Sequence, residues 1–371
     1  MFTKSFVLAS LANFLFYSNT NAYTLLPLYI QALGGREGQI GSIMAMYSLA
    51  AILCQASIGP FLDRWSRKPL MLLAAGMLTV ASTAFAFTTH LGWHFYMLRF
   101  LQGGAVALFL TSNLTLIADL APPSRRAEAV GIFGVAGLIS IALAPALGEA
   151  VLQAWGFRAF FVETILVAVA AFSVCQATEV PGRGTSEPSR ALGLSFWRTF
   201  FPILAAALQF GLASSIAFVF LPPFASHVGL PRIAPFYLLY TTAAVAVRLF
   251  GGRLADRLGK QRVILPSLVG LAIGILLFSV LRSTWLLVVI AVINGTSHGF
   301  VYPATSALAF DLAPVAARGR ALAAYNMASL TGAAIGAIGF GWLAQLVGYR
   351  PGFVVAGIVL ALGAGIFWRK R

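Results

Sequence analysis

The chain has 371 residues, of which 60% are hydrophobic and 9% are charged, against about 25% charged in an ordinary soluble domain. So small a number of charged residues cannot solvate the surface of a soluble protein. The composition therefore excludes a soluble globular protein and indicates an exterior that faces lipid. The formal net charge of +15 does not indicate a nucleic-acid partner, because the basic residues are spread over short loops.

Twelve apolar segments follow one another along the chain, and each has about the 20 residues that a helix needs to cross the hydrocarbon core. The loops between them are too short for a separate soluble domain. We therefore expect an all-α integral membrane protein with transmembrane helices at residues 6–31, 38–61, 69–88, 91–117, 124–150, 157–177, 195–224, 231–253, 262–281, 284–310, 319–345 and 350–368.

The longest polar stretch covers residues 178–194, and its Pro, Gly and Ser content is typical of a linker. It predicts two bundles of six helices, at residues 1–177 and 195–371. The two halves also repeat each other: residues 119–122 and 311–314 both read Asp-Leu-Ala-Pro at an offset of 192. Such a duplication is a known transporter architecture, with the substrate site at the interface of the repeats.

The basic residues indicate the orientation. With the N-terminus placed in the cytoplasm, most of the lysines and arginines fall in cytoplasmic segments, as the positive-inside rule requires. All seven tryptophans lie near predicted span ends, where amphipathic indoles prefer the headgroup level. We expect a multi-pass protein of the cell (inner) membrane with both termini in the cytoplasm.

Two loops and one helix carry a family pattern. Residues 59–68 read GPFLDRWSRK and residues 252–261 read GRLADRLGKQ, and Arg99-x-x-Gln102-Gly103 lies on the fourth span. In these motifs the chain resembles the major facilitator superfamily, whose signature loop has the pattern Gly-x-x-x-Asp-Arg-x-Gly followed by basic residues; Ser66 replaces the second glycine of the first copy. The resemblance implies two pseudo-symmetric six-helix bundles that transport a solute by alternating access.

The fifth span carries a weaker pattern. Gly131, Pro145 and Gly148 match the glycine-rich motif of efflux members of the family, whereas Ser140, Ala144 and Glu149 depart from it. The span therefore resembles that of a drug–proton antiporter or a sugar exporter.

The signature loops predict a gate on the cytoplasmic side. A carboxylate at a helix C-terminus is disfavoured by the helix dipole unless it has a partner. We expect the two loop aspartates to contact basic helix N-termini of the opposite half and to hold the cytoplasmic side closed; the alternative is that the positive charges serve topology alone. The residues of this expected gate are Asp63, Arg64, Asp256, Arg257, Arg125, Arg126, Arg318 and Arg320.

Three ionisable residues are candidates for proton coupling. Arg99 lies about two turns inside the fourth span, where a charge costs about 2.5–3.5 kcal/mol, and the repeat has Ala291 in its place. Glu163 and Glu149 are the available intramembrane carboxyls, and Arg99 could be their charge partner. The alternative is that both carboxyls lie near the outer surface in contact with water.

Polar stripes on the predicted spans indicate a solute cavity. The family resemblance implies that the first, fourth, seventh and tenth helices line it, and polar side chains recur on these helices at a period of 3.6. For any single residue, a hydrogen bond between helices is the alternative. The expected cavity residues are Asn13, Tyr17, Asn21, Gln102, Asn113, Gln209, Asn294 and His298.

The function most consistent with these features is export of a small organic solute (drug-like, sugar or metabolite) by proton antiport. The alternatives are a proton-coupled importer and, less favoured, a membrane sensor that transports nothing. We expect no enzyme activity, cofactor or metal, since the sequence has no P-loop, no catalytic set and no ligand cluster. The expected partners are the solute, protons and the lipid bilayer, with a monomer as the working unit.

Overall fold

The computed structural model describes residues 3–57, 66–122, 125–180, 194–251, 259–314 and 317–368, and these ranges contain helices and no strand. The chain folds into two compact units. The first comprises Met1–Gly34 with Met46–Ser186, and the second comprises Gly35–Ala45 with Glu187–Arg371. The division after Ser186 lies within the predicted linker, whereas the assignment of residues 35–45 to the second unit differs from the expected boundary.

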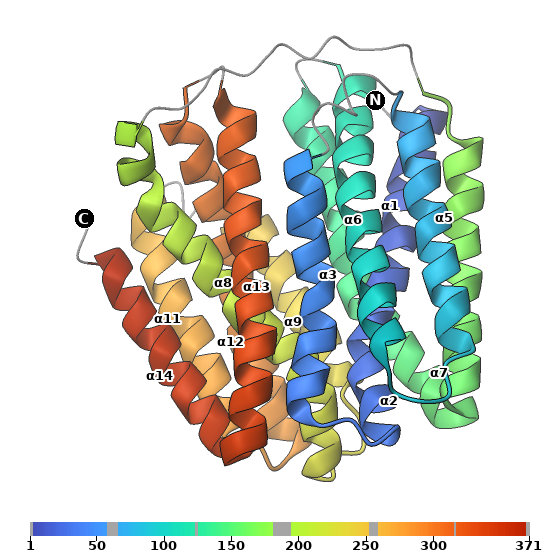
Figure 1. Ribbon diagram of the computed structural model, residues 1–371. Helices are drawn as coiled ribbons and strands as arrows, with labels where there is room; N and C mark the ends of the chain where they lie inside the picture. The colour runs from blue at the N-terminus through green and yellow to red at the C-terminus, as the bar shows by residue number, and fades with distance from the viewer. Residues whose placement is uncertain are drawn as a thin grey trace. The chain divides into compact units, whose positions relative to one another are not determined.

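The first unit is built from the N-terminal helices (Figure 1). α1 packs along α7, and α5 packs against both α6 and α7. In chain order the helices are α1 (Lys4–Ala22), the 3-10 turn η1 (Tyr23–Leu25), α2 (Leu26–Ala32), α3 (Glu37–Ser57), α5 (Arg67–Ala86), α6 (Trp93–Leu120) and α7 (Arg126–Ala177). The first part of α3, up to Ala45, is grouped with the second unit.

The second unit contains the remaining helices. α13 packs along α8, and α11 contacts both α12 and α14 (Figure 1). In chain order they are α8 (Leu194–His227), α9 (Ala234–Ala246), the π-helical turn η3 (Val247–Gly251), α11 (Lys260–Phe278), α12 (Thr284–Leu312), α13 (Arg318–Val347) and α14 (Tyr349–Trp368).

Every predicted span coincides with a helical segment of the described ranges, which confirms the all-α membrane fold. Eight of the described helices are long and apolar enough to cross a membrane, and residues 262–278 and 349–365 form shorter apolar helices. The first predicted span is interrupted by η1, just before Pro27 in the first turn of α2. Proline has no N–H to donate to the preceding turn, so this interruption has a local cause.

The fifth and sixth predicted spans form one element, α7, with a single non-helical residue. Gly156 has φ 77° and ψ −175°, a conformation that a side chain disfavours, and the helix is kinked there. In the second half Gly348, 192 residues later, has φ 85° and separates α13 from α14. Residues 156–158 read Gly-Phe-Arg and residues 348–350 read Gly-Tyr-Arg, so a repeated sequence corresponds to a repeated backbone turn.

Matching glycines bring helices into backbone contact in both units. A Cβ atom at Gly103 of α6 would lie 2.0 Å from the carbonyl oxygen of Tyr47 on α3, and one at Gly295 of α12 would lie 2.2 Å from that of Tyr240 on α9. Only glycine permits so close an approach, which is a common device of membrane helix packing. Gly103 and Gly295 lie 192 residues apart, the offset of the sequence repeat, so they hold equivalent helix pairs together.

Candidate functional site

Arg99 is buried on α6, with 5% of its surface exposed. Its Nη1 donates a 2.7 Å hydrogen bond to Oε1 of Gln102, one turn further along α6, and its guanidinium lies 4.8 Å from the ring centroid of Tyr47. Its Nε has no partner among the described residues. The buried cation is thus stabilised by an amide dipole and an aromatic face, and no described carboxylate pairs with it.

The amides on α1 and α6 connect helices of the first unit. Nδ2 of Asn13 donates to the carbonyl of Phe133 at 3.1 Å, and Nδ2 of Asn21 donates to Oγ of Ser140 at 2.8 Å, so both join α1 to α7. Nδ2 of Asn113 donates to the carbonyl of Ala9 at 3.1 Å and joins α6 to α1.

These amides keep unused hydrogen-bonding groups. Oδ1 of Asn13, Oδ1 of Asn113 and Nε2 of Gln102 are buried without a partner among the described residues. Tyr17 is half-buried on α1, with its ring edge-on to Phe16 at 6.1 Å. The first unit therefore holds polar atoms that a bound molecule could satisfy.

Sequence reasoning missed Asn19, which is fully buried. Its Nδ2 donates to Oγ of Ser82 at 3.0 Å and to the carbonyl of Thr164 at 2.6 Å, joining α1 to α5 and α7. Asn19 lies off the polar stripe of α1, and this second polar face was the signal that could have revealed it.

In the second unit the structure brings His298 and an aromatic group together. The hydroxyl of Tyr240 is hydrogen-bonded to Nδ1 of His298, and the ring of Phe210 lies edge-on to the imidazole at 4.8 Å. Asn294, one turn before His298 on α12, donates back to the carbonyl of Ile290 at 3.0 Å. Gln209 on α8 donates to the carbonyl of Leu360 on α14.

The two candidate carboxyls lie on α7, on either side of the turn at Gly156. Glu149 is buried, and its Oε1 accepts a 3.4 Å hydrogen bond from Nε2 of Gln153. Glu163 is half-buried, and its Oε2 has no partner among the described residues. Neither carboxylate pairs with Arg99, which is bonded to Gln102 instead.

The expected gate is only partly described. Asp63, Arg64, Asp256 and Arg257 lie outside the described residues, as does the side chain of Arg126. The gate residues that are described lie at helix N-termini. Arg125 and Arg320 are exposed, and the guanidinium of Arg318 lies 4.6 Å from the ring centroid of Phe310.

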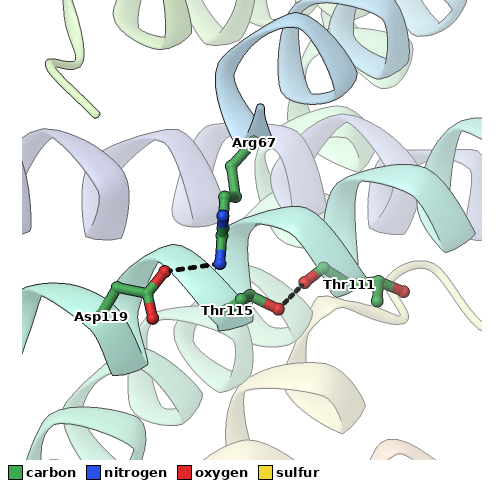
Figure 2. Close-up of polar contacts among 4 residues, drawn as sticks. All are labelled: Arg67, Thr111, Thr115 and Asp119. Atoms are coloured by element: carbon green, nitrogen blue, oxygen red, sulfur yellow. Dashed lines mark hydrogen bonds and ion pairs between the residues drawn. The ribbon is translucent and has the colours of Figure 1, made fainter. Parts of the chain in front are cut away.

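The signature motif makes one contact that the sequence did not indicate. Arg67 begins α5, and its Nη2 lies 2.9 Å from Oδ2 of Asp119 near the end of α6 (Figure 2). The arginine side chain is 7% exposed and that of the aspartate 34%. Beside this pair, Oγ1 of Thr115 donates to the carbonyl of Thr111 at 2.7 Å. The ion pair joins the motif loop to the fourth span inside the first unit.

Solved structures share this fold. A mutant form of the nucleoside transporter NupG has a TM-score of 0.82 at 16% identity, with 99% of each chain covered. The peptide transporter POT in complex with sulfate has a TM-score of 0.82 at 14% identity, with 99% of this chain and 94% of that chain covered. At this identity the likeness concerns the fold alone.

Curated relatives are transport proteins. The inner membrane transport protein YajR of Escherichia coli (strain K12) is 26% identical over 354 residues, 91% of this chain and 76% of the relative. The multi-drug resistance efflux pump PmrA homolog of Lactococcus lactis is 25% identical over 364 residues, 92% and 88% of the two chains. The multidrug resistance protein MdtG of Proteus mirabilis is 31% identical over 158 residues, 40% of this chain and 39% of the relative.

The family model described as Major Facilitator Superfamily matches residues 7–250 and 236–371, almost the whole chain. Together with the helical membrane fold, this match confirms the resemblance drawn from the signature loops. The protein is a multi-pass membrane transporter, not an enzyme, and it belongs to the Major Facilitator Superfamily.

Proposed function

We propose that the protein exports a small organic solute from the cytoplasm in exchange for protons, by alternating access of its two halves. The observation that carries this proposal is the similarity over 92% of the chain to a relative named as a multi-drug resistance efflux pump. The glycine–proline pattern of the fifth span, which resembles that of exporters, supports the same direction.

The proposed solute contacts are Asn13, Tyr17, Asn21, Gln102, Asn113, Gln209, Asn294 and His298. The unpartnered amide atoms of Asn13, Asn113 and Gln102 supply two acceptors and one donor, while neighbouring aromatic rings supply apolar surface. A sparse set of hydrogen-bonding groups among aromatic side chains suits an amphipathic molecule, because orientation needs only a few polar contacts.

We propose that Arg99 and the carboxyls of Glu163 and Glu149 couple transport to protons. A coupling group must change its proton affinity between the two open states, and a carboxyl without a fixed partner meets this requirement because a single new contact alters its environment. Glu163 is the stronger candidate, since its Oε2 is buried without a partner among the described residues.

The proposed gate uses the signature loops Asp63–Arg64 and Asp256–Arg257 and the helix N-termini at Arg125, Arg126, Arg318 and Arg320. The ion pair between Arg67 and Asp119 supports this role, because it fixes the first motif to α6 inside its own bundle. We further propose that both termini lie in the cytoplasm, as the basic loops indicate.

The test uses everted, energised membrane vesicles that contain the protein, with an internal pH dye. Adding a transported solute outside should make the acidic interior more alkaline, and Glu163→Gln should abolish this response. Glu179→Gln, at an exposed position at the start of the linker, is the matched control and should respond like the unaltered protein.

Two outcomes count against the proposal. A solute–proton symporter would give no alkalinisation when solute is added on this side alone. Equilibration of labelled solute without any proton movement would show an uncoupled carrier, and the roles given to Glu163 and Glu149 would then be wrong.

A further inference from the structure

An apolar cavity of about 360 Å³ lies in the second unit between α8, α13 and α14. Its walls include Phe201, Leu204, Ala205 and Leu208 of α8, Ala328 of α13 and Val359 of α14. Gln209 is the single polar side chain in the wall, and its amide already donates to the carbonyl of Leu360. The volume is at the lower end of the range for small-molecule sites, and the wall offers a ligand almost purely apolar contact.

The cavity opens onto the apolar outer surface of the unit. Phe201 is 49% exposed and Val359 is 52% exposed, so both form part of its rim. Around Val359, the exposed face of α14 carries Val355, Ile358 and Leu362, at helical spacings of three and four residues. An apolar face without a charged residue belongs in contact with acyl chains when the helix is in a bilayer.

The start of α8 places the cavity just below one headgroup layer. Trp197 lies four residues before Phe201, about 6 Å along α8. Tryptophans at span ends prefer the headgroup level. The cavity therefore occupies the depth of the first part of a lipid tail.

A basic residue, Arg198, lies one helical turn before the cavity wall on α8. Arg198 precedes Phe201 by three residues, so it continues the same α8 stripe that carries Phe201, Ala205 and Leu208. Its side chain is exposed and makes no hydrogen bond or ion pair with a described residue. A free basic side chain at headgroup level attracts anionic lipid.

From this arrangement we propose that the groove between α8, α13 and α14 is a binding site for one anionic phospholipid. One acyl chain fills the cavity beside Ala205 and Ala328, and the phosphate lies against Arg198. The site belongs to the second unit alone; Gln209, one of the proposed solute contacts, lies in its wall. The lipid proposal does not depend on the direction of transport.

The experiment uses the full-length protein in lipid nanodiscs that contain phosphatidylglycerol or phosphatidylcholine, each with a photoactivatable diazirine in one acyl chain. After illumination, the cross-linked peptides are quantified by mass spectrometry. Peptides that contain residues 201–208 and residue 359 should be labelled more strongly by the phosphatidylglycerol probe. Arg198→Gln should reduce this preference about fivefold, the effect of one basic side chain near a membrane surface.

Two further variants distinguish binding of the acyl chain from binding of the headgroup. Ala205→Leu fills the cavity and should reduce labelling of these peptides by both probes, whereas Ala361→Leu on the exposed surface of α14 should leave it unchanged. Equal labelling of the unaltered protein by the two probes would show that the groove does not prefer an anionic lipid, and would overturn the proposal. Unchanged labelling of a folded Ala205→Leu variant would also overturn it, since the cavity would then not hold the tail.

Discussion

At the scale of single residues, the buried Arg99 is a group of the first unit whose desolvation is costly. A guanidinium removed from water needs compensation, and here it comes from the ring of Tyr47 and the side-chain oxygen of Gln102. Neither partner is charged, so the positive charge of Arg99 remains free to attract an anionic group on a solute or a carboxylate that moves during transport.

The contribution of the Tyr47 ring can be measured. Tyr47→Leu should lower the stability of the purified protein by about 1–2 kcal/mol, because it removes a desolvated cation–π contact, whereas Tyr47→Phe should retain most of it. The apparent unfolding temperature in detergent is the measurement. In an Arg99→Met background the two variants should differ less, and an undiminished difference would show that the ring matters only for packing.

The sequence predicted which helix positions carry buried polar residues, but it did not predict their hydrogen-bond and ion-pair partners. The stripe of α1 identified Asn13 and Asn21, yet Asn19, on another face, makes the larger number of hydrogen bonds. Sequence periodicity shows which positions share a face, while the partner depends on which carbonyl or hydroxyl a neighbouring helix presents. For the same reason the pair formed by Arg67 and Asp119 could not be read from two motifs 52 residues apart.

At the scale of helices, glycine contacts determine which elements lie together. Gly103 holds α6 against α3, and Gly295 holds α12 against α9, each through a carbonyl oxygen of the partner helix. The two glycines lie 192 residues apart, which is the offset of the sequence repeat. The repeat did not identify Tyr47 and Tyr240, 193 residues apart, as the residues whose backbones they contact.

Gly103→Ala should destabilise the first unit by about 1–3 kcal/mol, because the new Cβ would overlap the Tyr47 carbonyl and force α6 away from α3. Gly104→Ala is the neighbouring control. Its Cβ would meet only the side chains of Cys54 and Met77, both at 3.4 Å, and should cost little. Thermal unfolding of the two variants in the same detergent tests this difference, and equal losses would contradict it.

The positions of the spans were predictable because each span is a run of apolar residues. The interruptions of helical structure within the spans were not predictable. The interruption before Pro27 and the tight turn at Gly156 depend on backbone dihedral angles, which composition averages out. Residues 35–45 likewise group with the second unit through contacts such as the 3.1 Å hydrogen bond from the amide of Gly38 to Oε1 of Gln345. Such long-range contacts leave no local signal.

At the scale of the whole molecule, orientation is the property that the basic loops predict. In a background lacking Cys54 and Cys175, Arg282→Cys should react with a membrane-impermeant maleimide on intact cells, whereas Arg262→Cys should react only after permeabilisation. Both positions are exposed, so access to the reagent is decided by the side of the membrane. The reverse pattern would place both termini outside the cell.

The turns at Gly156 and Gly348 restrict how the protein can evolve. At each, one glycine with positive φ is the entire connection between two spans, so an inserted peptide would have to unwind the last turns of both helices. The segment at 178–194, by contrast, is rich in residues that tolerate changes in length. New domains or epitopes are therefore expected to enter such a chain between its halves and to be excluded from the ends of these two helical hairpins.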